Sequence, residues 1–415
     1  MSDSLVAWLH DEPVAELERS KNGTIRLAYL SDAIDTREFN RPLLSCSLTI
    51  RSGGLDATAF VDGLLPEGGN RRLIADRAHL PSHDTFGLIE RYGRDIAGAV
   101  QFLPPGQHPT ADAHWSIEPL DSNQIDEIVA DLPNNPLAIV DESELSLGGL
   151  QDKMLLVRTA DGGWARPLGG QPSTHILKRD HDRYQGIVLA ECDALALARH
   201  AGLTNVDAWI ERHGDYDCIV VERFDRLIGP DGSVIGRTHQ EDACQALGRP
   251  PTQKYETRRG GGGPEFSEIA DLLDRYSPNP SEQLDRLAAM AAFTAIIGNA
   301  DAHGKNVAFL LDPSGTIELA PIYDTVPTVL WPRLVKEAAM TVGGSASLDA
   351  IGSDAIAREA RRWKHSPTSA GAAARRCAEL LIDAIDSQAI DPDGALAQRV
   401  TSTAPRFLDE PSPGT

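Results

Sequence analysis

The chain has 415 residues with ordinary contents of hydrophobic (41%) and charged (24%) residues, which predicts a soluble globular protein of two or three domains. Its formal net charge of −22 argues against a general nucleic-acid or anionic-membrane binder, because both need a basic face. Five scattered cysteines without a C-x-x-C motif, an acidic N-terminus and short apolar runs predict a reduced, cytoplasmic protein with no membrane contact.

The first 104 residues are predicted to form a strand-rich subdomain. LVAWL and VAELER, separated by DEP, predict a hairpin, and TIRLAYL and LSCSLTI predict further strands. AFVDGLLPEGGNRRLIADRA predicts two helices with a break at residues 66–69. Residues 105–138 are rich in proline and polar residues and predict a connector that carries one helix near residues 123–131.

Two further units are predicted after the connector. In residues 139–225, MLLVR, THILK, DAWIER and DCIVVERF predict strands, and GIVLAECDALALARHAGL predicts a helix. Residues 226–405 are largely helical by pattern, including PEFSEIADLLDRY and SEQLDRLAAMAAFTAIIG, and residues 406–415 predict a disordered tail. A strand-rich lobe followed by a helical lobe predicts an α+β fold.

A dense polar cluster, GNADAHGKN, separates two apolar segments of the helical unit. It places Asp301 five positions before Asn306, and the later turn IYDT supplies Asp324. Protein kinases use such a series: a carboxylate that takes the acceptor proton, then an amide and a second carboxylate that hold Mg²⁺. Taken alone, the Asp301–Asn306 spacing is more often a loop whose polar residues cap helices.

Three upstream features strengthen the kinase interpretation when they are read in order. LSLGGLQDK has small residues that let backbone N–H groups approach phosphates, although a plain β-turn explains it equally well. Lys178 ends a predicted strand and Glu191 lies early in the next helix, as in the kinase lysine–glutamate pair, although two unrelated surface charges are an alternative. VVERFDR leaves the strand-rich lobe as a hinge would, or simply as a strand end. Only seven of the 39 basic residues are lysines, and Lys153, Lys178 and Lys305 all fall in these segments.

The same segments resemble the HipA kinases, the toxin halves of bacterial HipA–HipB toxin–antitoxin systems. The resemblance is carried by SLGGLQDK, THILK, ERFDR, HQEDACQALG followed by KYE, and IIGNADAHGKN with PIYD. FVDGLLPEGGNRR and GRDIAGAV extend it to the HipA N-terminal subdomain. It implies a two-lobed, protein-kinase-like α+β fold with a strand-rich N-terminal subdomain and a helical C-terminal lobe, and an ATP- and Mg²⁺-dependent serine/threonine protein kinase activity.

The resemblance also implies roles for individual residues. Asp301 matches the catalytic aspartate, Asn306 and Asp324 the metal ligands, and Ser146 the serine at which family members autophosphorylate. The positions implied to bind ATP are Gly148, Gly149, Leu150, Gln151, Asp152, Lys153, Lys178, Glu222, Arg223, Phe224, His303, Gly304, Lys305, Asn306, Tyr323 and Asp324. Leu150 departs from the alanine that is usual in the family, which leaves the conformation of that loop open.

The resemblance further implies partners. Family substrates include aminoacyl-tRNA synthetases, so a protein of the translation machinery is the expected substrate. A small HipB-like, helix-turn-helix antitoxin is the expected partner, with DNA contacted only indirectly through it. Two alternatives stay open at this point: a small-molecule kinase on the same fold, and a co-repressor binding module that acts with a DNA-binding antitoxin.

Overall fold

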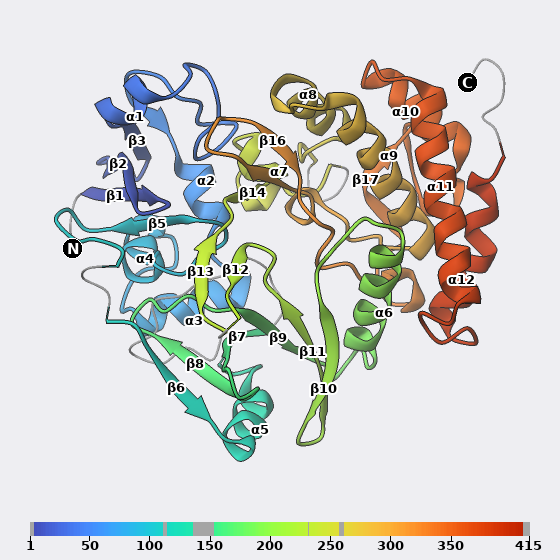
Figure 1. Ribbon diagram of the computed structural model, residues 1–415, viewed down its shortest axis with the longest axis horizontal. Coiled ribbons are helices and arrows are strands. Elements are labelled where there is room, and N and C mark those ends of the chain that lie inside the picture. The colour runs from blue at the N-terminus through green and yellow to red at the C-terminus, as the bar shows by residue number, and fades with distance from the viewer. Residues whose placement is uncertain (1–3, 111–113, 136–152, 231, 257–260, 410–415) are drawn as a thin grey trace.

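The computed structural model describes residues 4–110, 114–135, 153–230, 232–256 and 261–409. The described residues form an N-terminal subdomain, a strand-rich lobe and a helical lobe, which Figure 1 shows at its upper left, bottom and right. The predicted α+β arrangement is therefore confirmed. Each of these parts has buried hydrophobic residues of its own, so each contributes a core.

The N-terminal subdomain is a five-stranded antiparallel sheet, in the order β4-β3-β2-β1-β5, packed with four helices. Alternate residues of β3 are buried, as expected for a sheet with one face on a core. The hairpin and the two helices lie where the sequence predicts them, but the break between the helices comes earlier than the predicted residues 66–69, because α3 begins at Gly68. The elements are β1 Ser4–Leu9, β2 Glu12–Arg19, β3 Ile25–Tyr29, α1 Ser31–Thr36, β4 Leu55–Asp56, α2 Thr58–Gly63, α3 Gly68–Arg77, α4 Thr85–Tyr92 and β5 Val100–Leu103.

The strand predicted for LSCSLTI, residues 44–50, is wrong. Its apolar residues are buried, which explains the strand-like pattern, but the segment forms turns and pairs with no strand. Its backbone groups bind elsewhere: Cys46 donates its N–H to the Glu241 carboxylate at 2.7 Å, and Ile50 donates its N–H to the carbonyl of Arg41. The segment is thus held by the helical lobe and by local turns.

The strand-rich lobe is a six-stranded sheet in the order β10-β11-β9-β7-β8-β6. Its elements are β6 Ser116–Leu120, α5 Ser122–Asp131, β7 Lys153–Arg158, β8 Trp164–Leu168, β9 His175–Arg179, α6 Ile187–His200, β10 Ala208–His213 and β11 Tyr216–Glu222. The predicted connector contributes both the expected helix, α5, and an unexpected edge strand, β6, which pairs with β8. Pro119 in β6 explains the missed strand, because proline is tolerated at a sheet edge but weakens a strand prediction.

The helical lobe packs around α9, whose apolar residues from Leu284 to Ile297 are mostly buried. Its elements are β12 Arg226–Ile228, β13 Val234–Arg237, β14 Gln240–Asp242, α7 Ala243–Ala246, η1 Pro251–Gln253, α8 Phe266–Tyr276, α9 Pro280–Ile297, η2 Gly304–Asn306, β15 Ala308–Leu311, β16 Ile317–Leu319, η3 Thr328–Leu330, β17 Glu337–Val342, β18 Ser345–Ser347, η4 Leu348–Ala350, α10 Ser353–Arg362, α11 Pro367–Asp386, α12 Ala395–Thr403 and η5 Ala404–Phe407. The disordered tail predicted for residues 406–415 is wrong at its start, because η5 buries Phe407 completely, and residues 410–415 lie outside the described residues.

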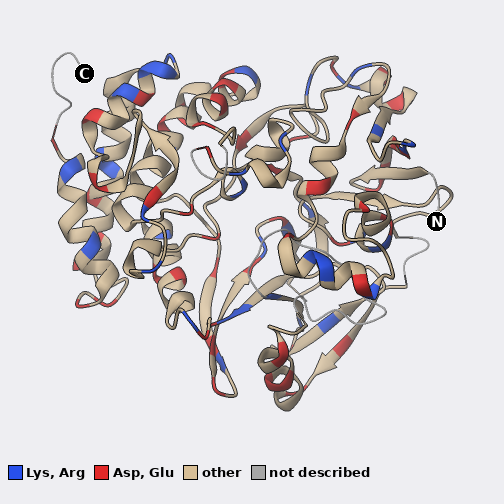
Figure 2. Ribbon diagram, turned by 180° about the vertical axis from the view of Figure 1, so that it is seen from behind, with Lys and Arg blue, Asp and Glu red and all other residues tan. Residues whose placement is uncertain are grey.

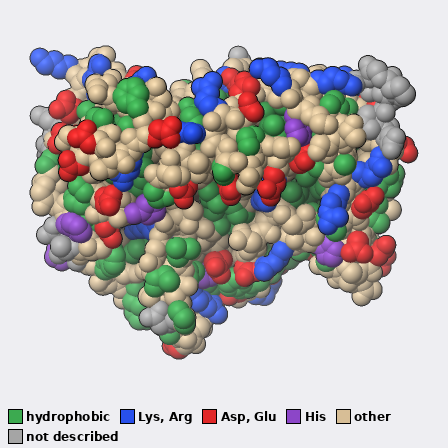
Figure 3. Space-filling view, turned by 45° about the horizontal axis from the view of Figure 1, so that its top comes forward, with side chains coloured by type: hydrophobic (Ala, Val, Ile, Leu, Met, Phe, Trp, Pro, Cys, Tyr) green, Lys and Arg blue, Asp and Glu red, His purple; other side chains and the backbone are tan. Residues whose placement is uncertain are grey.

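Basic and acidic residues, coloured blue and red on the ribbon of Figure 2, are scattered over the chain rather than separated by lobe. The face drawn in Figure 3 likewise mixes acidic, basic and hydrophobic side chains. Among the helices that the structure describes, none combines the length and the apolarity that crossing a membrane requires.

Candidate active site

The polar cluster begins where α9 ends, at Gly298 in the left-handed conformation (φ +81°). A Cβ atom at this position would lie 2.2 Å from the Val329 side chain, so only glycine fits there. The loop that follows is fixed by neighbours: Ala300 donates its N–H to the Thr328 hydroxyl at 2.8 Å, and Asp301 donates its N–H to the Asn299 side chain at 3.0 Å. The predicted catalytic loop is therefore held by apolar packing on one side and by hydrogen bonds along its backbone.

The fold brings the three predicted catalytic and metal-binding residues together. Asn306 donates its side-chain N–H to the Asp324 carbonyl at 3.1 Å and lies 3.5 Å from the Asp301 carbonyl. This contact leaves the amide oxygen of Asn306 as the atom that can approach a metal ion. The Asp301 carboxylate accepts a hydrogen bond from the Tyr255 hydroxyl at 2.9 Å. Along the chain, the proposed general base comes first and the two proposed metal ligands follow, as in protein kinases.

Lys178 links the two lobes at this site. Its ammonium group lies 2.6 Å from the Glu191 carboxylate, which is 1% exposed, and 2.6 Å from the Asp324 carboxylate, which is 43% exposed. Burial would lower the pKa of Lys178, but the two carboxylates outweigh it and hold that pKa above its usual value. Burial likewise opposes the charged form of Asp324, yet Lys178 and Lys153 hold the pKa of Asp324 well below its usual range. The predicted lysine–glutamate pair is therefore present, and Asp324 is a carboxylate at neutral pH.

Lys153 lies directly opposite Lys178, because β7 pairs with β9 in that register. Burial, and then the neighbouring Lys178, lower the pKa of Lys153 to about 8. Lys178 and Lys153 therefore place two buried ammonium groups beside the partly exposed Asp324 carboxylate, where phosphate oxygens could approach them.

We expect Lys153→Met to stabilise the ligand-free protein while it weakens ATP binding. A charged Lys153 is destabilising below its folded-state pKa of about 8, and this cost disappears as the pH rises towards about 10.4, the pKa of an unfolded lysine. The variant should therefore gain about 1–2 kcal/mol at pH 7, with a smaller gain at pH 10. Chemical unfolding at both pH values checks this, with the exposed Lys21→Met as the matched control. An equal gain at the two pH values would contradict it.

The hinge residues differ in what their side chains do. Glu222 ends β11, and the ring of Phe224 lies 5.5 Å from the ring of Tyr323, next to Asp324. The Arg223 side chain points instead into a buried network with Asp225 and Ser173. An ATP contact at Arg223 stays a prediction, and the backbone is what could make it.

The other residues of the catalytic loop have two kinds of role: some face the site, and others hold the loop in place. Lys305 donates to the Gly63 carbonyl and to the Asp242 carboxylate, both at 2.9 Å, so its ammonium group ties the loop to the N-terminal subdomain. Gly304 leaves no room for a Cβ atom, because Pro264 would lie 2.4 Å from it. Burial lowers the pKa of His303 to about 3, and its Nδ1 atom has no hydrogen-bond partner among the described residues. Such an atom is one that a bound ligand can satisfy.

The remaining predicted ATP-binding positions, Gly148, Gly149, Leu150, Gln151 and Asp152, lie outside the described residues, as does Ser146. The residues that are described fit a Mg²⁺–ATP complex. Asp324 offers a partly exposed carboxylate, and the oriented amide of Asn306 can provide a second oxygen ligand. Mg²⁺ prefers oxygen ligands and commonly completes its shell with phosphate and water, so two side chains are an adequate protein share. Among the described residues, no group of three His, Cys, Asp or Glu side chains has the geometry for a metal site.

The HQED motif lies at the interface between the helical lobe and the N-terminal subdomain. His239 binds the Leu44 carbonyl at 3.0 Å, and Glu241 accepts the N–H of Cys46. Burial raises the pKa of Glu241 to about 8. Asp242 binds Lys305, and Gln245 reaches the carbonyl of Phe60. Sequence reasoning flagged this motif without giving it a role, and it missed Tyr255 and Glu67 as neighbours of the site.

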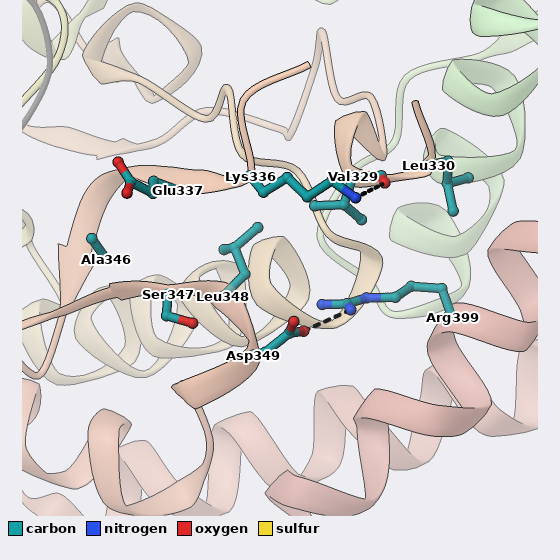
Figure 4. A pocket seen from close by; sticks show the side chains of 9 residues that line it. All are labelled: Val329, Leu330, Lys336, Glu337, Ala346, Ser347, Leu348, Asp349 and Arg399. Carbon is teal, nitrogen blue, oxygen red and sulfur yellow. Dashed lines mark hydrogen bonds and ion pairs between the residues drawn. The ribbon is translucent and has the colours of Figure 1, made fainter. Parts of the chain in front are cut away.

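A separate pocket of about 440 Å³ lies beside η3, β18 and α12. It is lined by Val329, Leu330, Lys336, Glu337, Ala346, Ser347, Leu348, Asp349 and Arg399. Figure 4 shows Arg399 pointing at Asp349 and Lys336 reaching the Val329 carbonyl. Because both cationic side chains are engaged by neighbouring groups, we assign the pocket no part in the chemistry of the site.

The comparisons with known proteins point to one family over most of the chain. The model of the HipA-like C-terminal domain matches residues 145–389, and that of the HipA N-terminal domain matches residues 5–103. A putative kinase of Sinorhizobium fredii, Y4mE, is 37% identical over 366 residues, or 86% of this chain and 85% of the relative. The serine/threonine-protein kinase toxin HipA of Shewanella oneidensis is 31% identical over 68% of this chain and 66% of its own.

A solved structure extends the likeness to three dimensions. The structure of a complex of HipA, HipB and operator DNA from Shewanella oneidensis contains a chain that superposes with a TM-score of 0.81. The two chains are 27% identical, and the match covers 97% of this chain and 96% of the other. The two-lobed fold and the N-terminal subdomain are therefore shared as a whole.

Proposed function

The chain belongs to the HipA family of kinases, and from this premise we propose that it transfers the γ-phosphate of ATP to serine or threonine hydroxyls of a protein. The observation that carries the proposal is the cluster of Lys178, Asp301, Asn306 and Asp324 at the junction of the two lobes. Each role that phosphoryl transfer requires is filled there by a residue of suitable chemistry.

The chemistry assigns one task to each residue. Asp301 accepts the proton of the acceptor hydroxyl while that oxygen bonds to the γ-phosphorus and ADP leaves with the electrons of the broken P–O bond. Lys178 and Lys153 offset the negative charge of the phosphates. Asn306 and Asp324 would hold Mg²⁺, which supplies further charge neutralisation. Neutral His303 lines the same loop and can offer its unpartnered nitrogen to the nucleotide.

The substrate that we propose is a protein of the translation machinery, such as an aminoacyl-tRNA synthetase. A HipB-like antitoxin is the proposed partner, supported by the complex in which the similar HipA chain is found. The net charge of −22 favours DNA contact through that partner rather than through this chain. A role as co-repressor with the antitoxin is compatible with kinase activity, and we propose a cytoplasmic location for both.

Autophosphorylation at Ser146 tests the proposal without a known substrate. We expect the wild-type protein to gain one phosphate per chain on incubation with ATP and Mg²⁺, as measured by intact-mass spectrometry. Ser146→Ala should lower this gain at least tenfold, because alanine has no hydroxyl to accept the phosphate. In the wild type one event should end the reaction, because a phosphate next to the glycine loop adds charge where the ATP phosphates bind. The serine-to-alanine control is Ser314, in an exposed turn. Phosphate found elsewhere with Ser146 unmodified would refute this site.

A further inference from the structure

Three consecutive residues after η1 brace the catalytic loop from outside. The first, Lys254, is 4% exposed and places its ammonium group 3.1 Å from both carboxylate oxygens of Glu67 in the N-terminal subdomain. Its carbonyl accepts the N–H of Gly304, in the catalytic loop, at 3.0 Å. One residue therefore joins the N-terminal subdomain to the catalytic loop.

The second residue, Tyr255, contacts the proposed general base itself. Its hydroxyl donates to Oδ1 of Asp301 at 2.9 Å, and its ring meets the ring of His303 edge to face at 5.1 Å. The tyrosine is 8% exposed, so the ring has little freedom to turn. A buried donor at fixed distance restricts the rotation of the Asp301 carboxylate, and carboxylate orientation decides how well a general base meets its proton.

The third residue, Glu256, anchors the segment to the helical lobe. Its N–H donates to the Ala339 carbonyl at 3.1 Å, and its carboxylate accepts the N–H and the hydroxyl of Thr341 at 2.6 and 2.7 Å. Both partners lie in β17. The hydroxyl of Tyr255 is thus held between a strand on one side and an ion pair with the N-terminal subdomain on the other.

We propose that Tyr255 is a positioning residue for Asp301, and that Glu67 of the N-terminal subdomain helps to set that position through Lys254. This inference rests on the proposed kinase function and goes beyond it, since it makes the N-terminal subdomain part of the catalytic machinery. This segment contacts both the N-terminal subdomain and the Asp301 carboxylate.

The test is Tyr255→Phe, which keeps the ring against His303 and removes only the hydroxyl. The measured quantity is the rate of phosphate gain by intact mass over a series of ATP concentrations. We expect the rate at saturating ATP to fall about tenfold, with the half-saturating ATP concentration changed less than twofold, because the proposed role of the hydroxyl is to orient the base and not to bind the nucleotide. Tyr276→Phe, at a similarly buried tyrosine of the same lobe, is the matched control and should match the wild type.

Glu67→Gln tests the far end of the brace. We expect the saturating rate to fall about threefold, and no further fall when Glu67→Gln is added to Tyr255→Phe, because both changes act through the same carboxylate. Glu12→Gln, in an exposed ion pair of the same subdomain, is the control. Independent, multiplying effects of the two changes would overturn the link from Glu67 to Asp301.

The outcomes separate the inference from the proposed function. A wild-type protein that gains no phosphate, starting from an unmodified mass, overturns the kinase function and the role of Tyr255 together. An active wild type with an equally active Tyr255→Phe overturns the positioning role alone. A variant whose half-saturating ATP concentration rises in step with its loss of rate overturns it too, because the hydroxyl would then serve nucleotide binding.

Discussion

Asp301→Asn is expected to lower the rate of phosphate transfer at least about 100-fold while leaving the fold and nucleotide binding intact. General-base catalysis contributes about 10²–10⁴-fold, and an amide cannot take the acceptor proton. The amide oxygen can still accept the Tyr255 hydroxyl, so the loop should keep its conformation. The measurement is the rate of phosphate gain by intact mass at saturating ATP, with ATP affinity from calorimetry.

The matched control for this change is Asp312→Asn, in the exposed turn between β15 and β16. It makes the same chemical change in the same lobe, and this variant should transfer phosphate at the wild-type rate. More than a tenth of wild-type activity in Asp301→Asn, with ATP affinity unchanged, would assign the base to another residue. A complete loss of ATP affinity would instead place Asp301 in nucleotide binding.

The catalytic positions were predictable because their order follows from local pattern. The sequence around Asp301 and Asn306 lies between a long apolar helix and a strand, and Asp324 follows the next strand. Short loops that join buried elements have few ways to run, so their spacing carries three-dimensional information. Lys178 and Glu191 were predictable for the same reason, since a strand end and the early part of the next helix lie close together.

Side-chain direction was not predictable where the partner lies far away in sequence. Arg223 and Lys305 have the expected places in the chain. The Arg223 guanidinium, however, donates to the distant Ser173 hydroxyl and Ile96 carbonyl, and the Lys305 ammonium group donates to Gly63 and Asp242. No local pattern shows which of several carboxylates or carbonyls a long cation will reach. The false strand at residues 44–50 has a different origin. Leu44, Leu48 and Ile50 are buried in the core of the subdomain itself, while Cys46 packs against the helical lobe, so the burial reflects packing rather than pairing in a sheet.

The interface between the N-terminal subdomain and the kinase lobes contains a fully buried network of charged residues. Asp95 is 0% exposed and lies 2.8 Å from the Arg226 guanidinium, while Ser173 donates both its N–H and its hydroxyl to the same carboxylate. Burial opposes the charged form of Asp95, but Arg226 and Arg223 outweigh it and hold its pKa below the usual value. The GRDIAGAV and ERFDR motifs therefore meet in one ion network at the hinge.

Asp95→Asn should consequently destabilise the protein by about 3–5 kcal/mol at pH 7, because it removes one of the two carboxylates, Asp95 and Asp225, that neutralise Arg223 and Arg226 in the buried network. Urea unfolding followed by tryptophan fluorescence measures this, with Glu12→Gln as a control that should cost less than about 1 kcal/mol, since Glu12 is 67% exposed. The folded-state pKa of Asp95 is depressed, so its contribution is present above the unfolded value of about 3.9 and lost on acidification below it. The difference between wild type and variant should therefore hold from pH 7 to 5 and shrink only below about pH 4. A variant as stable as Glu12→Gln at pH 7 would show that the arginines find other partners, and that packing rather than charge joins the subdomain to the hinge.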